Sequence, residues 1–515
     1  MGRAAGWLQV AAAAGCAVAA WALAAAMVKE RVAAWKQWLR AVEVVREFEE
    51  SFETPTERLQ RVVNSLAIEM FAGLASENAS KVRMLLTCVD RLPNWYITDT
   101  DVMPSNEEGI YYAIDIGGTS FRVLKVQLGA GYTIIDKKVQ LQPIPTKGTI
   151  EDFFNFIAST LKNFIEKEGD KGKALGFTFS FPIEQFSITS GSLIRWTKEF
   201  SIEEAVGKDV AQCLNEALVR NGMHLQVNAL MNNTVGTLAL GHYYDKDTVA
   251  AVIIGAGTNA CYIESNEAIT KGQGLLTNSG RMVVNVEWGS FRPPQIPLTP
   301  YDICFNNETQ NYYDQGFEKM ISGVYLGEIA RLVFHKMAQV SDVFGTAVDG
   351  LAIPFTLSTP CLAAIREDDS GDLREVGRRL EEHLKISNVP LKTRRLVQRV
   401  CDIVTRRAAR LAAAGIVALL QKIGRDGTCG GTTRVRRITG MPKRSVIAIE
   451  GGLIQGYAAF REYMNEAVGE ILGEEIAATV VLRMVEEGSG IGAALVAAAY
   501  SSNQHNSIHV GMVQT

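Results

Sequence analysis

Residue types suited to holding phosphate gather in residues 111–126, Y-Y-A-I-D-I-G-G-T-S-F-R-V-L-K-V. Apolar, β-rich residues on both sides predict two strands of a buried sheet joined by a tight turn. Gly117 and Gly118 allow the turn to approach a ligand closely, and its amides, with the Thr119 hydroxyl, could cradle phosphate oxygens. Asp115, at the strand end, could hold Mg²⁺ through water. Taken alone, the motif also fits an ordinary hairpin with a capping aspartate.

A second stretch repeats this pattern. Residues 249–264, V-A-A-V-I-I-G-A-G-T-N-A-C-Y-I-E, predict two more strands with a glycine-rich turn at residues 255–258. Two such loops between strands indicate one phosphate loop for each half of a cleft. Further on, residues 446–453 (V-I-A-I-E-G-G-L) predict a third strand before a double glycine, and residues 488–495 (G-S-G-I-G-A-A-L) begin a last helix.

Polar side chains that interrupt apolar runs are candidates for binding a polyol. Asn232 and Asn233 lie in the apolar run of residues 227–240, and buried amides need hydrogen-bond partners such as sugar hydroxyls. Thr197 and Lys198 follow Trp196 and could offer a hydroxyl and an ammonium, although a surface loop would have the same composition.

The elements that position these residues follow from periodicity. Residues 150–165 predict an amphipathic helix, and residues 175–181 predict a buried strand with Ser180 at its carboxyl end. Apolar residues recur every three and four positions between residues 40 and 105, which predicts helices that include residues 79–86, A-S-K-V-R-M-L-L. Pro93 and Pro104 mark the exit into the first strand.

Composition narrows the class of protein. The 515 residues are 47% hydrophobic and 21% charged, which is typical of a globular protein of two to three domains. A net charge of -4 gives no electrostatic case for nucleic-acid binding. The 8 cysteines form no C-x-x-C and indicate reduced thiols. Zincin and P-loop motifs do not occur in the sequence, and the 6 histidines form no catalytic cluster.

The amino terminus predicts a membrane anchor. Residues 7–28 are apolar and alanine-rich apart from Gln9, and this length is sufficient to cross a bilayer. Lys29, Arg31, Lys36 and Arg40 follow at once, which places the rest of the chain on the cytosolic side. A cleaved signal peptide is the alternative, but most of the positive charge follows the apolar run instead of preceding it. The alanine content makes the segment only weakly hydrophobic for a spanning helix, so a peripheral or organelle-surface anchor is a further interpretation.

These stretches together resemble the hexokinase family, and its plant members most closely. The motifs D-I-G-G-T-S-F-R-V, F-T-F-S-F-P, G-S-L-I-R-W-T-K, N-N-T-V-G-T, G-A-G-T-N-A, N-V-E-W-G and G-S-G-I-G-A-A occur in family order, between residues 40 and 499. The resemblance implies two actin-like (RNase H-like) α/β ATPase domains that close on hexose and Mg-ATP. It divides the chain into an anchor with a basic flank (1–39), a helical segment (40–105), a small α/β domain (106–236), a large α/β domain (237–479) and a carboxyl-terminal helix with a tail (480–515).

The resemblance also assigns roles to single residues. Those implied to hold the hexose, glucose or fructose, are Ser180, Thr197, Lys198, Asn232, Asn233, Asn259, Glu287 and Glu318. Of these, Asn233 and Lys198 are also implied to occupy catalytic positions. Those implied to hold ATP are Asp115, Gly117, Gly118, Thr119, Ser120, Arg122, Gly255, Ala256, Gly257, Thr258, Glu450, Gly451, Gly452, Gly488 and Gly490, with Mg²⁺ at Asp115. Residues 412–416 are implied to line the adenosine.

Departures from the family pattern cluster on the path of phosphoryl transfer. The family has an aspartate at the catalytic position of Asn233, a threonine at Ala256 and an asparagine at Ser120. Glu450 for aspartate and a glycine-rich basic insert, residues 425–444, are lesser changes. A neutral amide is not a useful base near neutral pH, and a positioned base contributes roughly 10²–10⁴-fold in rate. The sequence therefore predicts a hexose-binding protein with low or absent kinase activity, which suits a glucose-sensing, regulatory role.

Other interpretations stay open from the sequence. One is an active hexokinase that phosphorylates glucose and fructose for glycolysis. A second is a membrane-anchored scaffold without ligands, and a third is an actin-like structural ATPase. The basic insert is a solvated loop, a docking site for an anionic protein partner, or an obstruction to nucleotide entry. The anchor implies the mitochondrial outer membrane, facing the cytosol, with another organelle membrane or the plastid as alternatives.

Overall fold

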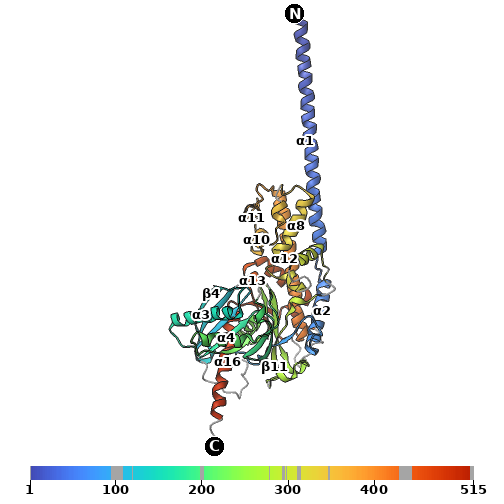
Figure 1. The fold of residues 1–515 in the computed structure, drawn as a ribbon. Coiled ribbons are helices and arrows are strands. Elements are labelled where there is room, and N and C mark those ends of the chain that lie inside the picture. The colour runs from blue at the N-terminus through green and yellow to red at the C-terminus, as the bar shows by residue number, and fades with distance from the viewer. Residues whose placement is uncertain are drawn as a thin grey trace. The chain divides into compact units, whose positions relative to one another are not determined.

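The computed structural model describes residues 2–93, 108–118, 120–197, 202–277, 279–292, 296, 298–309, 315–345, 348–427 and 443–510, without the side chains of residues 2–20, 132 and 502–510. The chain forms two compact units (Figure 1). Unit 1 comprises Met1–Glu53, Leu298–Gln310 and Leu326–Thr405. Unit 2 comprises Thr54–Pro297, Asn311–Tyr325 and Arg406–Thr515. All candidate site residues belong to unit 2.

Unit 2 contains two large sheets. The five-stranded sheet has the order β4 (Ile134–Pro143), β3 (Ser120–Leu128), β2 (Gly109–Ile116), β5 (Ala174–Phe179) and β8 (Val227–Met231). Its strands β2, β5 and β8 are parallel, whereas β2, β3 and β4 form an antiparallel meander. Because parallel strands end at one edge of a sheet, Asp115, Ser180 and Asn232 are brought to the same edge.

The six-stranded sheet has the order β1 (Leu85–Leu86), β11 (Arg281–Asn285), β10 (Thr258–Ser265), β9 (Thr248–Ile254), β12 (Ser445–Glu450) and β13 (Val480–Met484). Its strands β9, β12 and β13 are parallel, so the turn after β9 and Glu450 at the end of β12 share an edge. A separate antiparallel pair consists of β6 (Ile183–Ser187) and β7 (Ser190–Leu193).

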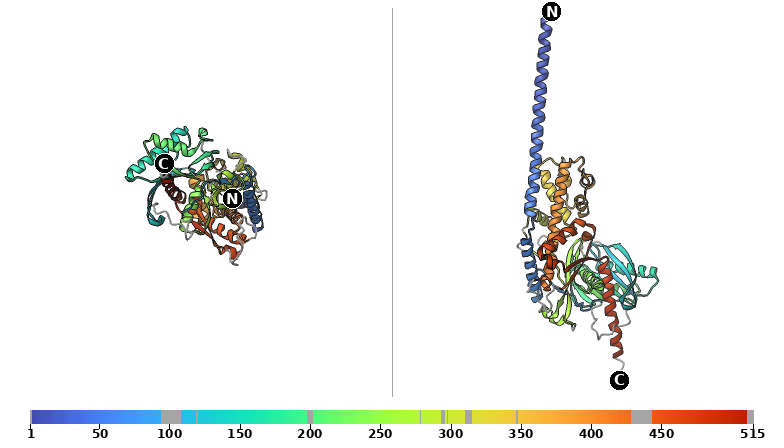
Figure 2. Two further views of the ribbon diagram at one scale, coloured as in Figure 1. Left: turned by 90° about the horizontal axis from the view of Figure 1, so that it is seen from below. Right: turned by 180° about the vertical axis from the view of Figure 1, so that it is seen from behind.

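Helices α5 (Asn233–Tyr244) and α16 (Gly488–Val510) share one buried core with both sheets. Their backbones approach closely because glycines meet at the crossing: a Cβ on Gly492 would lie 1.8 Å from the Gly236 carbonyl oxygen, and one on Gly236 would lie 2.2 Å from that of Ser489. Figures 1 and 2 show the far end of α16 projecting beyond the sheets.

The remaining helices of unit 2 lie outside this shared core. Phenylalanines of α3 and leucines of α4 pack on the five-stranded sheet as a second apolar core. The helices of this group are α2 (Thr56–Ala75), α3 (Ile150–Glu168), α4 (Val210–Arg220), α7 (Gly316–Ile321), α13 (Gly452–Gly456), α14 (Ala458–Leu472) and α15 (Glu474–Ala477). A buried ion pair between Lys422 and Glu264, with the Tyr262 hydroxyl 2.7 Å from the same carboxylate, fastens the end of α12 to β10.

Unit 1 is helical. It consists of α1 (Gly2–Phe52), α6 (Pro300–Glu308), α8 (Leu326–Val340), α9 (Val348–Leu351), α10 (Thr359–Arg366), α11 (Arg374–Leu384) and the first part of α12 (Leu391–Lys422), which continues into unit 2 at Arg406. Ala41, Val44, Val45, Phe48 and Phe52 of α1 are buried. Figure 2 shows that the amino-terminal half of α1 extends beyond the other helices of this unit.

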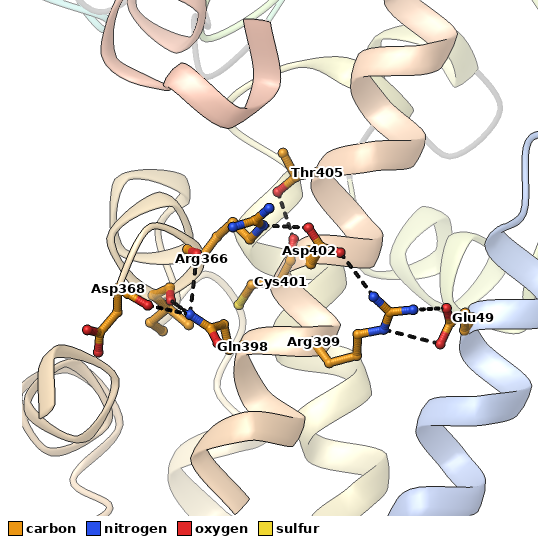
Figure 3. A network of polar contacts seen from close by, with 9 residues as sticks. Glu49, Arg366, Asp368, Gln398, Arg399, Cys401, Asp402 and Thr405 are labelled. Carbon is orange, nitrogen blue, oxygen red and sulfur yellow. Dashed lines mark hydrogen bonds and ion pairs between the residues drawn. The ribbon is translucent and has the colours of Figure 1, made fainter. Parts of the chain in front are cut away.

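A polar network ties three of these helices together (Figure 3). Arg399 of α12 forms ion pairs with Glu49 of α1 and, at 3.3 Å, with Asp402, which also binds Arg366 of α10. Gln398 donates to the carbonyl oxygen of Asp368 at 2.7 Å. Because its carboxylate has two arginine partners and little exposure, Asp402 is the centre of this network.

Most predicted elements are confirmed. The strands on both sides of each glycine turn, the helix from Ile150, and the helix that begins at Gly488 all form. The helix predicted over residues 79–86 is wrong: Leu85 and Leu86 pair with Asn285 and Val284 at the edge of the six-stranded sheet. The apolar spacing there reflects burial of single residues on that edge and not a helical face.

The predicted anchor lies on α1. The side chains before Trp21 lie outside the described part of the chain, as does most of the basic insert, residues 428–442. Trp21, Leu23, Met27 and Val28 are exposed. Among the described residues, none of the helices combines the length and the apolarity that crossing a membrane requires.

Candidate functional site

An amide–carboxylate set, here Asn232, Asn259, Asn285 and Glu287, forms the first part of the site. The Asn259 amide lies at the centre and donates to Asn285 and Glu287, at 2.8 Å each, and to Asn232 at 3.3 Å. Asn285 also donates to Glu287, at 2.9 Å. Three amide side chains, from the end of β8, from β10 and from β11, therefore gather at the Glu287 carboxylate, and those of Asn259 and Asn285 donate to it.

Glu287 has an unusual backbone and charge environment. Its φ of 56° lies in the left-handed region, which is uncommon for residues other than glycine and often marks functional sites. Burial raises the pKa of its carboxyl, while the hydrogen bond from Asn285, the charge of Arg195 and the hydrogen bond from Asn259 lower it. The ionised group is thus desolvated but supplied with donors.

Glu318, near the start of α7, is the second carboxylate of this region. Its Oε2 accepts from the Thr258 amide at 2.8 Å, and a Cβ on Gly257 would come within 2.6 Å of that oxygen. The Trp288 indole donates to the Thr258 hydroxyl at 3.2 Å. With a side chain at position 257, the Glu318 carboxylate would have to shift away from the second glycine turn.

Ser180 and Asn233 line the same edge. The Ser180 hydroxyl oxygen is buried and has no hydrogen-bond partner among the described residues. Asn232 caps α5 by accepting from the Thr234 amide at 3.1 Å, which leaves Asn233 as the first helical residue. The half-buried Asn233 side chain makes no hydrogen bond within the part of the chain that the structure describes. Thr197 is buried, whereas Lys198 lies outside the described residues.

A carboxylate cluster, here Asp115, Arg122, Thr237, Glu450 and Ser489, forms the second part of the site. Asp115 accepts from Thr178 and from Ser489, both at 2.6 Å, and from Arg122 at 3.2 Å. Ser489 also donates its backbone amide to Glu450 at 3.0 Å, so one serine at the start of α16 joins a strand of each sheet.

The carboxyl group of Glu450 has a strongly raised pKa. Burial raises its pKa to about 7, and the nearby Asp115 charge adds to this, while the hydrogen bond from Thr237 opposes it. The Thr237 hydroxyl lies 2.6 Å from Glu450 and 3.1 Å from the Asn233 carbonyl oxygen. The first turns of α5 therefore link the two parts of the site.

Glycine turns surround this cluster. Gly117 donates to the Ser120 carbonyl at 2.9 Å, and Gly255 donates to that of Gly257 at 2.9 Å, which closes each turn. Gly451 has a φ of 129°, and a Cβ there would meet the Ile254 carbonyl oxygen at 2.4 Å. Gly452 faces open space, and Ala256 is exposed.

The other glycines predicted to bind nucleotide differ in what they contact. A Cβ on Gly488 would meet Glu450 at 2.8 Å, whereas one on Gly490 would meet the Leu124 side chain at 2.5 Å, so Gly490 has a packing role. Gly118 belongs to the first turn, and Thr119 lies outside the described residues.

Several residues of the site had no role predicted from the sequence. Thr178, Thr237, Ser489 and Asn285 each hold a candidate residue by a hydrogen bond. Asn285 stands two positions before Glu287, and the alternation of polar residues in N-V-E could have indicated a shared face. The others are single hydroxyls whose partners lie far away in the sequence.

The arrangement supports two kinds of chemistry. Amides and carboxylates that both donate and accept suit a polyhydroxylated ligand. Paired glycine turns beside the Asp115 carboxylate suit phosphate oxygens and a hydrated Mg²⁺. Within the described residues, no group of three or more acidic, histidine or cysteine side chains is placed to hold a metal ion.

Comparison with known proteins gives consistent matches. Two models of the hexokinase family match, over residues 44–243 and 249–499. Hexokinase-10 of Oryza sativa subsp. japonica is 74% identical, covering 98% of this chain and 99% of that protein, and Hexokinase-3 of Arabidopsis thaliana is 50% identical, covering 96% and 100%. The solved hexokinase from Schistosoma mansoni complexed with glucose has a TM-score of 0.76 and 28% identity, over 90% of this chain and 99% of that chain.

Proposed function

The chain belongs to the hexokinase family, and we propose that it binds a hexose and Mg-ATP but transfers the phosphoryl group slowly or not at all. One observation carries the proposal: a complete amide–carboxylate set lies beside Asn233, a position without an acidic side chain. Glucose is the first candidate ligand and fructose the second. The proposed role is regulatory, with the sugar as the signal.

Three features support hexose binding. The buried Ser180 hydroxyl lacks a partner among the described residues, and a buried polar group of this kind is stable only when a ligand or water satisfies it. Glu287 is held in a left-handed conformation, which costs energy and is typical of binding sites. The solved relative whose fold this chain shares is in complex with glucose.

Nucleotide binding is supported by the glycine turns. A side chain at Gly451 would collide with the β9 backbone, and Gly452 beside it faces open space. Asp115, held in place by Thr178 and Ser489, is the residue that would hold Mg²⁺ through water. Mg-ATP would supply the phosphoryl group and the charge neutralisation, and Arg122 would add a cation beside that carboxylate.

The proposed impairment has two causes. Family members have an aspartate at position 233 that accepts the proton of the attacking hydroxyl, whereas Asn233 cannot, and such a base contributes roughly 10²–10⁴-fold. Ala256 removes a hydroxyl donor to a phosphate, and one donor to a charged group contributes about 1.5–3 kcal/mol. Together the two changes reduce turnover by roughly 10³–10⁶-fold if they add.

The test measures binding and turnover on one purified sample. Calorimetry with glucose is expected to show clear binding, and a coupled assay with glucose and Mg-ATP is expected to show turnover far below the usual range of about 1–100 s⁻¹. Turnover within that range would refute the impairment and establish the alternative, an active hexokinase. The absence of any heat with glucose would refute hexose binding and favour a scaffold.

A regulatory role needs a change of shape that glucose favours. We therefore propose that glucose shifts the population of conformers, and small-angle scattering with and without glucose tests this directly. We also propose that α1 attaches the protein to a membrane, with the mitochondrial outer surface as the first candidate, because exposed tryptophans and Lys29, Arg31 and Lys36 flank its apolar part.

A further inference from the structure

Arg195 lies between β7 and the buried Thr197, on a segment that is held firmly. The neighbouring Trp196 packs against Phe181 with ring centroids 4.8 Å apart and donates to the Ile202 carbonyl at 2.6 Å. Ile194 donates its amide to the Pro182 carbonyl at 3.0 Å. The Arg195 guanidinium donates to the Ser290 hydroxyl at 3.4 Å, which brings it to the short turn that begins just after Glu287.

A second arginine reaches the same place from the segment before β1. Leu85 pairs with Asn285 in antiparallel register, and the Met84 amide donates to the Val286 carbonyl at 3.2 Å. This register sets Arg83 opposite Glu287. Lys271 donates to the Arg83 carbonyl at 2.8 Å and fixes the backbone there. Arg83 is exposed, whereas Arg195 is half-buried, so solvent screens the charge of Arg195 less.

Burial and the neighbouring polar groups have opposite effects on the pKa of Glu287. Burial raises the pKa of the Glu287 carboxyl, and Arg195 and Arg83 lower it together with the amides of Asn285 and Asn259. Glu318 is the other acid that faces Arg195. Without a nearby cation, a desolvated carboxyl takes up a proton and loses acceptor capacity.

We propose that Arg195, assisted by Arg83, is a positioning residue that keeps Glu287 ionised, so that the carboxylate accepts hydrogen bonds from hexose hydroxyl groups. The inference rests on the proposed hexose binding and adds the residue that sets its pH range. The guanidinium acts through Glu287, not by contact with the sugar.

The first test is the pH profile of glucose affinity from pH 5 to 8, measured by calorimetry. In Arg195→Leu the midpoint of the acid-side loss of affinity is expected to move to higher pH, so that affinity near the wild-type midpoint falls several-fold while affinity at pH 8 stays close to wild type. Arg195→Lys is expected to restore the wild-type midpoint. Arg281→Leu, an exposed arginine at the other end of β11, is the matched control and should leave the profile unchanged.

The outcomes separate the inference from a purely structural role. An equal loss of affinity at every pH in Arg195→Leu would overturn it, and so would an unchanged midpoint. When Glu287→Gln is present in both proteins, the pH profiles with arginine and with leucine at position 195 are expected to differ no longer, because the titrating group is gone.

A second measurement needs no sugar. A carboxyl whose pKa is raised in the folded state stabilises the fold at low pH and loses that contribution as pH rises through the folded pKa. Removal of Arg195 raises the pKa further, so Arg195→Leu is expected to lower the unfolding temperature more at pH 7.5 than at pH 5. Equal lowering of the unfolding temperature at both pH values would contradict the inference, whether or not the wild-type protein binds glucose. A failure of the wild-type protein to bind glucose would refute only the proposed function.

Discussion

At the residue scale, the acids of the site lie in two different regions. Glu287 and Glu318 lie with amides and backbone donors in the region proposed for the sugar, and Asp115 lies with hydroxyls and an arginine where phosphate is proposed. Asn233 stands between the two regions, at the first turn of α5, and supplies no base. The proposed impairment therefore depends chiefly on the neutral side chain at this position.

Restoring an acid at position 233 tests the proposed impairment directly. Asn233→Asp together with Ala256→Thr is expected to raise turnover of glucose by roughly 10³-fold or more, because a base and a phosphate donor return. Glucose affinity is expected to change little. The coupled assay measures the gain, with Asn465→Asp, at an exposed position of α14, as a control for added charge. If the double variant gains nothing, the defect lies elsewhere in the chain.

Glu450 predicts a pH dependence of stability. Its folded pKa of about 7 lies above the value of an exposed glutamate, so it stabilises the fold below about pH 4.5 and this contribution is lost as pH rises towards 7 and beyond. The full effect is at most about 3 kcal/mol. Glu450→Gln keeps an acceptor for Thr237 and Ser489 and is expected to flatten the decline in unfolding temperature between pH 5 and 8. Identical slopes for both proteins would argue against a buried, titrating Glu450.

At the scale of elements, the site depends on the crossing of α5 and α16. Asn232, Asn233 and Thr237 lie at the cap and on the first turns of α5, and Ser489 lies on the first turn of α16. Gly236 and Gly492 let the two backbones touch, so the helix starts stay within hydrogen-bond range of Asp115 and Glu450. The glycines thus position the polar residues without taking part in binding.

Gly492→Ala tests the crossing. The new methyl would lie 1.8 Å from the Gly236 carbonyl oxygen, and backbone on both sides cannot move aside cheaply, so we expect a loss of about 1–3 kcal/mol or more in unfolding free energy. Gly469→Ala on α14 meets nothing within 4 Å and is the matched control, expected to be neutral or stabilising by about 0.5–1 kcal/mol. Denaturant unfolding measures both, and equal effects would show that the crossing is not tight.

At the scale of the whole molecule, the two compact units interleave in sequence. Unit 1 takes up α1, α6 and α8–α11, and α12 runs from unit 1 into unit 2 at Arg406. Every candidate residue for hexose or nucleotide lies in unit 2, whereas the proposed anchor belongs to unit 1. The proposed binding and the proposed attachment therefore belong to different parts of the chain.

Removal of residues 2–28 tests this separation. Trp21 is 78% exposed, and Ala41 is the first buried residue among the described side chains of α1, so we expect the shortened protein to keep its unfolding temperature and its glucose affinity. It is expected to lose flotation with phosphatidylcholine vesicles that contain an anionic phospholipid, since the apolar segment that would enter the bilayer is gone. Undiminished flotation would place the membrane contact elsewhere.

The sequence alone determined the features that depend on local backbone chemistry. Glycine pairs after apolar runs predicted both strand–turn–strand motifs, and the resemblance to the family assigned Asn232, Asn259, Glu287 and Glu318 to one site. Short-range periodicity and the freedom of glycine suffice for the strand and turn predictions, because the competing states differ within a few residues. Asn233 was also evident as a neutral residue in a position where the family has an acid.

The tertiary structure decided what depends on distant partners. Residues 79–86 have a helical pattern, yet Leu85 and Leu86 pair with β11 at a sheet edge, and this register brings Arg83 opposite Glu287. The raised pKa of Glu450 and the links from Ser489 to both sheets likewise arise from strands that lie far apart in sequence. Long-range register and burial set these relations, and a local window of sequence contains neither.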